Sequence, residues 1–187
     1  MSVRAVRIEL PEWIDDVVDW ARTYADDESR MRLAIALAAE NVKHGGGPFG
    51  AIIVEEKTGR LVSVGVNRVV PENNSILHAE VLAFMVAQRR VGSYTLGAPG
   101  LPAHTVVSSC DPCAMCLGAT LWSGVRRLVC GATRDDAMRA GFDEGPVFPE
   151  SYRYLEDRGV TIVRGVLQEE ARAVLEQYAA SGKIYNG

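Results

Sequence analysis

The sequence is poor in the features that define several special classes of protein. Its 187 residues include only four cysteines, too few for a disulfide-rich scaffold. No stretch approaches the roughly 20 consecutive apolar residues of a membrane-spanning helix. Basic residues are not in excess, because 20 Lys and Arg stand against 24 Asp and Glu and give a formal net charge of -4. These absences argue against a secreted miniprotein, a membrane protein and a broad nucleic-acid-binding surface.

The remaining composition is that of an ordinary globular protein, with 48% hydrophobic and 24% charged residues. At this length we expect a single domain over residues 1–187. The first residues, MSVRAVRIELPEWIDD, contain no apolar segment of the kind that directs secretion. We therefore expect a cytoplasmic protein with no membrane partner.

Apolar periodicity and turn residues predict alternating helices and strands. The predicted helices cover residues 12–25, 28–43, 77–91, 113–123, 151–159 and 168–180, and the first of them is an extra N-terminal helix. The predicted strands cover residues 48–56, 60–67, 104–109, 126–133 and 160–166, and the first two form a hairpin. Residues 141–149 are expected to be irregular, and a polar tail covers about 182–187. This order predicts one α/β domain in which helices cover the faces of a mixed five-stranded sheet.

Three of the four cysteines are three residues apart in the segment SSCDPCAMCLG, residues 108–118. Cys113 and Cys116 fall on one face of a predicted first helical turn, where two thiolates can hold one metal ion. A structural zinc knuckle, a redox pair and part of an iron–sulfur cluster are alternatives. A cluster requires a fourth cysteine nearby, but Cys130 lies in a predicted core strand. We interpret Cys110 as a neighbour of the site that does not bind metal.

Only three histidines are present, and one of them completes a recognisable pattern. His78 begins the sequence His-Ala-Glu, and Pro112-Cys113-Ala-Met-Cys116 follows it, as in the H-x-E and P-C-x-x-C signature of zinc deaminases. Three protein ligands, His78, Cys113 and Cys116, leave a fourth tetrahedral position for water, which is typical of a catalytic zinc site. His44, at a predicted helix end, and His104, at the start of a strand, are predicted to be structural.

The same pattern predicts hydrolytic chemistry. Zinc lowers the pKa of bound water towards neutrality and so provides hydroxide as a nucleophile. Glu80 lies two residues after the histidine ligand, so we predict that it shuttles the proton of this water to a ring nitrogen and to the departing ammonia. The attacked carbon bears an exocyclic amine.

Five motifs are shared with a known family: GGPFGAIIV (46–54), GVNRV (65–69), HAEV (78–81), SSCDPCAMCLGA (108–119) and ATRDDAMRAGFDEG (132–145). The sequence resembles the cytidine deaminase-like zinc superfamily and, within it, the bacterial guanine deaminases. The resemblance implies a three-layer α/β/α sandwich, one Zn²⁺ per subunit, and hydrolysis of guanine to xanthine and ammonia. It also implies a homodimer, which exchanges its C-terminal segments in some members.

The resemblance further implies a set of substrate contacts. Asn67 and Glu144 would bind the base, and Glu144, where the family often has aspartate, would also belong to the catalytic set. Phe49 would stack on the base. Tyr185, in the tail, would help to close the site over the substrate.

Other functions remain open from the sequence alone. The substrate class could be cytosine, an aminotriazine or the adenosine of a tRNA. The C-terminal stretch QEEARAVLEQ has no run of basic residues, and this argues against a tRNA and against nucleic-acid partners in general. A zinc module without catalytic activity is a further alternative, but it would leave Glu80 without a role.

Overall fold

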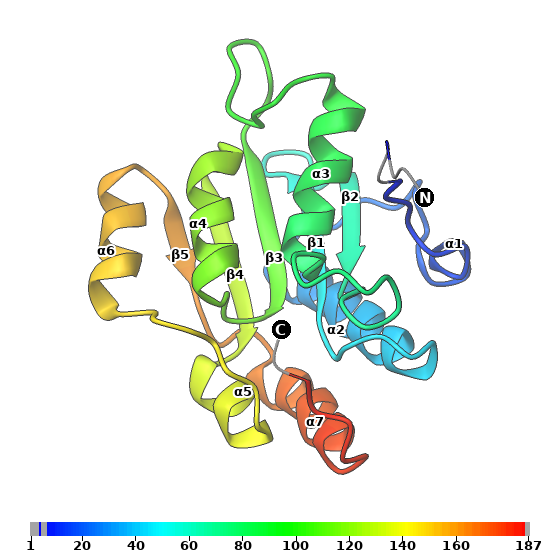
Figure 1. The fold of residues 1–187 in the computed structure, drawn as a ribbon. Helices are drawn as coiled ribbons and strands as arrows, with labels where there is room; N and C mark the ends of the chain where they lie inside the picture. Colours follow the sequence, from blue (N-terminus) through cyan, green and yellow to red (C-terminus); the bar gives the residue numbers. More distant parts are fainter. Residues whose placement is uncertain (1–3, 5–6, 186–187) are drawn as a thin grey trace.

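The computed structural model describes residue 4 and residues 7–185. Its centre is a five-stranded sheet with the strand order β2-β1-β3-β4-β5 (Figure 1). The strands are β1 (Gly50–Glu55), β2 (Leu61–Val66), β3 (His104–Cys110), β4 (Arg127–Ala132) and β5 (Thr161–Val163). Strand β1 pairs antiparallel with both β2 and β3, whereas β3, β4 and β5 are parallel. The predicted mixed sheet is therefore confirmed.

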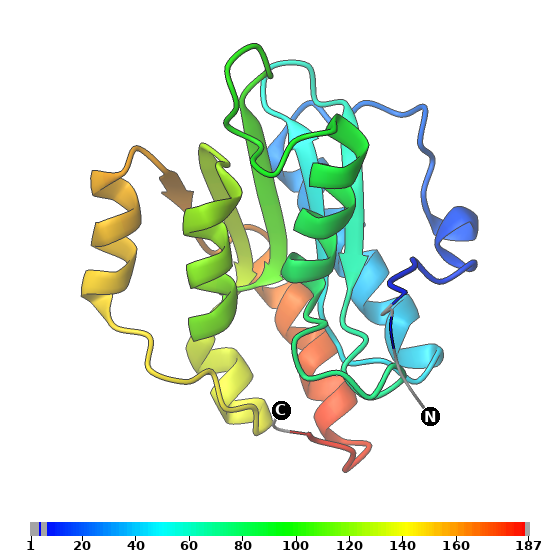
Figure 2. The same cartoon turned by 45° about the horizontal axis from the view of Figure 1, so that its top comes forward.

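Seven helices surround this sheet in the described residues. They are α1 (Ile14–Val17), α2 (Asp27–Lys43), α3 (Ala79–Val91), α4 (Ala114–Ser123), α5 (Arg134–Ala140), α6 (Pro149–Asp157) and α7 (Gln168–Ala179). Helices α3 and α4 cover one face, and α2 and α7 cover the other (Figure 2). The three-layer α/β/α sandwich is confirmed.

The alternation of side chains along β1 divides the core between these two faces. Ala51 and Ile53 pack under α3 and α4, whereas Ile52 and Val54 pack under α2. All four side chains are completely buried. Because both faces of the strand are covered, its sequence is an almost continuous apolar run.

The predicted N-terminal helix over residues 12–25 is wrong beyond the short α1. Val18 is extended. Thr23 then forms an antiparallel bridge with Arg60, and the N–H of Tyr24 donates to the carbonyl of Gly59 at 2.8 Å. These contacts with the β1–β2 turn provide main-chain partners that a continuous helix would lack, so tertiary pairing overrides the helical periodicity.

Helix α5 was not predicted from the sequence. It begins with a capping box, in which the Thr133 side chain accepts from the N–H of Asp136 and the Asp136 carboxylate accepts from the N–H of Thr133. Gly141, with φ of 105°, ends it. The predicted strand over 160–166 is also shorter than expected, because only Thr161–Val163 pair with β4. The other predicted helices and strands are present, with ends shifted by a few residues at most.

The C-terminal tail folds back onto the domain. The Tyr178 hydroxyl donates to the carbonyl of Lys183 at 2.9 Å, and the Tyr185 ring packs edge-on against Phe142 with centroids 5.8 Å apart. The last two residues of the predicted tail, 186–187, lie outside the described residues. None of the helices in the described part of the chain has the length and apolar character that a bilayer span requires.

Candidate metal and substrate site

The candidate metal ligands lie where two helices begin. His78 is the N-cap residue of α3, and Cys113 is the N-cap residue of α4. Cys116 lies one turn further along α4 and is buried. Both helices start beside the carboxyl end of β3, so the ligands converge at one edge of the sheet (Figure 1). The chain thus brings together two segments separated by more than 30 residues.

The spacing of the three ligand atoms suits a zinc ion. Nδ1 of His78 lies 3.5 Å from Sγ of Cys113 and 3.5 Å from Sγ of Cys116. All three atoms lie within 4.8 Å of one another. Tetrahedral zinc with Zn–N and Zn–S bonds of about 2.1 and 2.3 Å requires N···S separations of about 3.6 Å. The residues present therefore fit zinc, and a fourth position stays available.

The pKa values of the two thiols also favour binding of a metal cation, because one of them ionises readily. A hydrogen bond from Cys116 and a second one from His78 lower the pKa of Cys113 to about 4. The N-terminus of α4 adds its partial positive charge. The pKa of Cys116 is raised, because in the metal-free pair this thiol keeps the proton that it donates to Cys113. A bound dication would replace that proton.

Glu80 lies beside the ligands, in the first turn of α3. Its Oε1 accepts a hydrogen bond from the Ser108 hydroxyl at 3.0 Å, and its Oε2 lies 3.3 Å from Sγ of Cys116. Burial raises the pKa of Glu80, and the negative charge of Cys113 adds to this effect. A carboxylate with a raised pKa is suited to accept and return a proton near neutral pH.

A partly open cavity of about 50 Å³ adjoins these residues. Eleven residues line it: Phe49, Asn67, His78, Ala79, Glu80, Asp111, Cys113, Phe142, Asp143, Glu144 and Tyr185. Every site residue predicted from the sequence is in this set except Cys116. This third candidate metal ligand is buried and does not line the cavity. In this conformation the cavity is small and has room for a few water molecules.

The rest of the cavity lining combines aromatic rings with two polar side chains. Phe49 meets Phe142 edge-to-face, with ring centroids 4.9 Å apart. Asn67 and Glu144 are both almost completely buried. Burial raises the pKa of Glu144 to about 8, and the nearby thiolate of Cys113 acts in the same direction. A dication on the ligands would oppose both effects and favour the carboxylate form.

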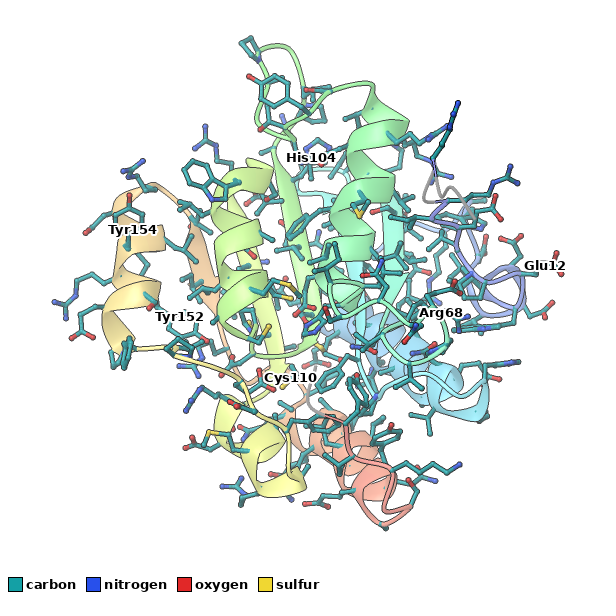
Figure 3. The ribbon with its side chains drawn as sticks, viewed as in Figure 1. Glu12, Arg68, His104, Cys110, Tyr152 and Tyr154 are labelled. Carbon is teal, nitrogen blue, oxygen red and sulfur yellow. The ribbon has the colours of Figure 1, made fainter. Side chains whose placement is uncertain are left out.

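The remaining cysteines and histidines have structural surroundings, as predicted. Sγ of Cys110 lies 3.7 Å from the carbonyl of Thr133, and Cys130 is buried in β4. Figure 3 shows His104 and Cys110 at opposite ends of β3. His44 ends α2 and stacks on Trp13 with ring centroids 5.0 Å apart.

Several residues of the site were not predicted. Asp111, Phe142 and Asp143 line the cavity, and Ser108 contacts Glu80. All four lie within the shared motifs SSCDPC and GFDE, so the signal was present in the sequence. What the sequence could not provide was the direction in which each side chain points.

Comparison with known proteins agrees with this geometry. Residues 24–132 match the family described as the cytidine and deoxycytidylate deaminase zinc-binding region. The chain is 37% identical to guanine deaminase from Bacillus subtilis over 76% of its own length and 87% of that protein. It is 28% identical to a tRNA-specific adenosine deaminase from Buchnera aphidicola over 81% and 93% of the two chains. This chain belongs to the cytidine and deoxycytidylate deaminase family of zinc-binding proteins.

Among the solved structures compared, a guanine deaminase is more similar to this chain than a tRNA deaminase is. The structure of guanine deaminase from Nitrosomonas europaea has a TM-score of 0.91 and 42% identity, covering 96% of this chain and 99% of that one. The protein NE0047 in complex with 2,6-diaminopurine gives a TM-score of 0.92 and 44% identity over 97% of both chains. A tRNA:A34 deaminase is more distant, with a TM-score of 0.61.

Proposed function

We propose that this protein is a guanine deaminase, which hydrolyses guanine to xanthine and ammonia. The observation that carries the proposal is one cavity that joins a zinc-type ligand triad, a buried carboxylate beside it, and a recognition wall with Asn67 and Glu144. The similarity to the guanine deaminases of Bacillus subtilis and Nitrosomonas europaea supports the choice of base.

His78, Cys113 and Cys116 would hold the zinc. When bound, the ion lowers the pKa of water and so supplies the nucleophile for attack on the ring carbon. The net reaction adds the oxygen of water to the carbon that bears the 2-amino group and breaks that C–N bond. One hydrogen of the water and one further proton must therefore be moved during turnover.

Glu80 is placed to move these protons. Its carboxylate would take one proton of the water and pass it to the adjacent ring nitrogen. It would then take the second proton, from the hydroxyl now bonded to the carbon, and pass it to the amine so that ammonia leaves. Ser108 holds Oε1, which directs Oε2 towards the ligand side of the cavity. Because Glu80 is buried, no bulk water competes for these transfers.

Recognition of guanine follows from its hydrogen-bonding edge. Guanine presents a ring N–H and a 2-amino group side by side, and the carboxylate of Glu144 can accept from both. The amide of Asn67 supplies donors for a ring nitrogen or the carbonyl of the base. Phe49 and Tyr185 would cover the flat faces. Cytosine has fewer donors to satisfy a buried carboxylate.

The test is ammonia release from zinc-loaded protein offered guanine, adenine, cytosine, an aminotriazine, guanosine and a tRNA in parallel. We expect rapid release from guanine. Release from cytosine or the tRNA alone would preserve the zinc chemistry but reject the proposed substrate. A net charge of -4 disfavours the tRNA.

Replacing Glu80 with Gln tests the mechanism. Glu80→Gln preserves the shape of the side chain and leaves all three ligands in place, so we expect normal zinc content. Turnover should fall by at least about 100-fold, because the variant has no general base. Metal analysis and ammonia release on the same preparation provide both values. Substantial remaining activity would reject the proton-shuttle role.

We further propose a cytoplasmic homodimer with one zinc per subunit. Helix α4 has no charged residue over Ala114–Ser123, although Trp122 is 78% exposed and Met115 and Ala119 are half-buried. A surface helix that is apolar on all sides is usually covered by a partner. The free state of all four cysteines agrees with a reducing compartment.

A further inference from the structure

A buried asparagine outside the cavity holds two segments of the recognition wall together. Asn41 lies on α2 and is completely buried. Its Nδ2 donates to the carbonyl of Gly47 at 2.8 Å and to the carbonyl of Asn67 at 2.7 Å. One side chain thus connects the loop before β1 with the loop after β2, and Asn67 itself lines the cavity.

The loop from Gly45 to Gly47 is shaped around this amide. The main-chain carbonyl of Asn41 accepts from the N–H of Gly46 at 2.9 Å. A Cβ atom at Gly46 would lie 2.3 Å from Nδ2 of Asn41, and one at Gly47 would lie 2.2 Å from the Tyr185 hydroxyl. A side chain at Gly46 would displace the Asn41 amide and one at Gly47 would displace Tyr185 or Asn67, so the loop packs directly against these side chains.

The hydrogen bonds of Asn67 hold its main chain and its side-chain oxygen in place. Its N–H donates to the carbonyl of Phe49 at 3.1 Å, its carbonyl accepts from Asn41, and its Oδ1 accepts from the N–H of Val69 at 3.2 Å. These contacts engage every polar group of Asn67 except the amide nitrogen. That nitrogen is the group of Asn67 that remains to donate to a ligand in the cavity.

We propose that Asn41 is a positioning residue for substrate recognition. Through the carbonyls of Gly47 and Asn67 it fixes the Asn67 amide and the adjoining Phe49 loop in the orientation that receives the base. The proposal rests on the proposed function, because the ligand is taken to be guanine. The two hydrogen bonds of the Asn41 amide both go to the recognition side, to the carbonyls of Gly47 and Asn67.

A double-mutant cycle tests this role. Asn41→Leu removes both donors at nearly constant volume and is measured alone and together with Asn67→Ala, using zinc-loaded protein and guanine. We expect Asn41→Leu to lower kcat/KM by about 10- to 100-fold, mainly through KM, as the loss of two buried hydrogen bonds suggests. In the Asn67→Ala background the same change should cost less than about 3-fold, because the group that it positions is already absent.

Two controls separate positioning from general destabilisation. Ser63 is also buried and donates to the carbonyl of Ala83 at 2.7 Å, and neither residue lines the cavity, so Ser63→Ala should leave kcat and KM unchanged. Zinc content should be the same in every variant. If Asn41→Leu is insoluble, Asn41→Ser replaces it, because the shorter side chain cannot reach both carbonyls.

Equal losses in the two backgrounds, or a loss in kcat with unchanged KM, would overturn the inference. The unmodified protein tests the proposed function independently, because it alone shows whether guanine is turned over. Calorimetric titration with the guanine analogue 8-azaguanine measures the dissociation constants of the same four proteins. If the changes in binding free energy caused by Asn41→Leu and Asn67→Ala are additive, positioning by Asn41 is also rejected.

Discussion

At the scale of the residue, the direction of Glu80 depends on one serine. Ser108 lies in β3, is almost completely buried, and donates its hydroxyl hydrogen to Oε1 of Glu80. A buried carboxylate without this donor would lose part of its solvation and would be free to turn. The hydrogen bond therefore stabilises the ionised form of Glu80 and fixes the orientation of Oε2.

Ser108→Ala should lower kcat by about 10- to 100-fold with little change in KM, because the base remains present but is no longer held in place. Steady-state ammonia release measures both constants. Ser123→Ala is the matched control, since Ser123 is a buried serine that donates to the carbonyl of Thr120 at the far end of α4. Equal kcat in Ser108→Ala and the unmodified protein would contradict this prediction.

Single residues also show how far a site can be predicted from sequence. His78, Glu80, Cys113 and Cys116 were predictable because metal binding demands particular atoms at a particular spacing, whatever surrounds them. Asn41 was not, because its amide serves two carbonyls that become neighbours only after β1 and β2 have paired. No local pattern marks an asparagine for that role.

At the scale of the element, the same contrast separates long helices from short ones. Helices α2, α3 and α7 have several turns with apolar spacing and were predicted closely. The segment 12–25 has similar periodicity, but its main chain pairs with the β1–β2 turn through Thr23 and Tyr24. Helix α5 has only seven residues, so its capping box, rather than its periodicity, was the available signal.

Asp136→Asn tests the importance of that capping box. Burial alone would raise the pKa of Asp136, but hydrogen bonds from Thr133 and Gln168 and the charge of Arg139 lower it to about 2. The folded state therefore favours the carboxylate, and its contribution of about 2 kcal/mol is present above the ordinary pKa and disappears as the pH falls towards 2.

Urea unfolding of metal-free Asp136→Asn and unmodified protein should therefore differ by about 2 kcal/mol near pH 6. The difference should narrow between pH 4 and pH 2, because the native carboxylate becomes protonated in that window. Metal-free samples are used so that pH-dependent loss of zinc does not change the measured free energy of unfolding. A difference that does not depend on pH would show that the hydrogen bonds matter and the charge does not.

The C-terminal tail is the other element with a testable role. Tyr185 contributes to the cavity wall, so deletion of residues 183–187 should raise KM for guanine and lower kcat through the entry of water. Steady-state kinetics at unchanged zinc content measures the effect. Unchanged kcat and KM would show that the tail does not close the site.

Exchange of the tail between subunits has its own signature. Mixed dimers of Glu80→Gln and the 183–187 deletion contain one intact base and one intact tail. If each tail covers the partner's site, these two meet in a single site and activity returns after mixing. If each tail covers its own site, the mixture remains as inactive as its components.

At the scale of the whole molecule, the expected assembly is a dimer in which the uncharged helix α4 forms the contact between subunits. Trp122→Glu places a charge within the proposed contact, and burying an unpaired charge is costly. We expect the unmodified protein to sediment as a dimer and Trp122→Glu to sediment as a monomer. Tyr94→Glu is the control, because Tyr94 is 89% exposed and lies outside α4. A dimer that survives Trp122→Glu would place the interface elsewhere.

The site is divided between the starts of two helices and a set of loops, and this division has a consequence for how this protein can change. The metal ligands belong to the starts of α3 and α4, whereas Phe49, Asn67 and Glu144 come from three separate connections and Tyr185 comes from the tail. Mutations in these connections can therefore retune the choice of base while the reactive centre stays intact. Such a division makes selectivity evolvable: a lineage can explore new substrates without first losing the ability to cleave a C–N bond.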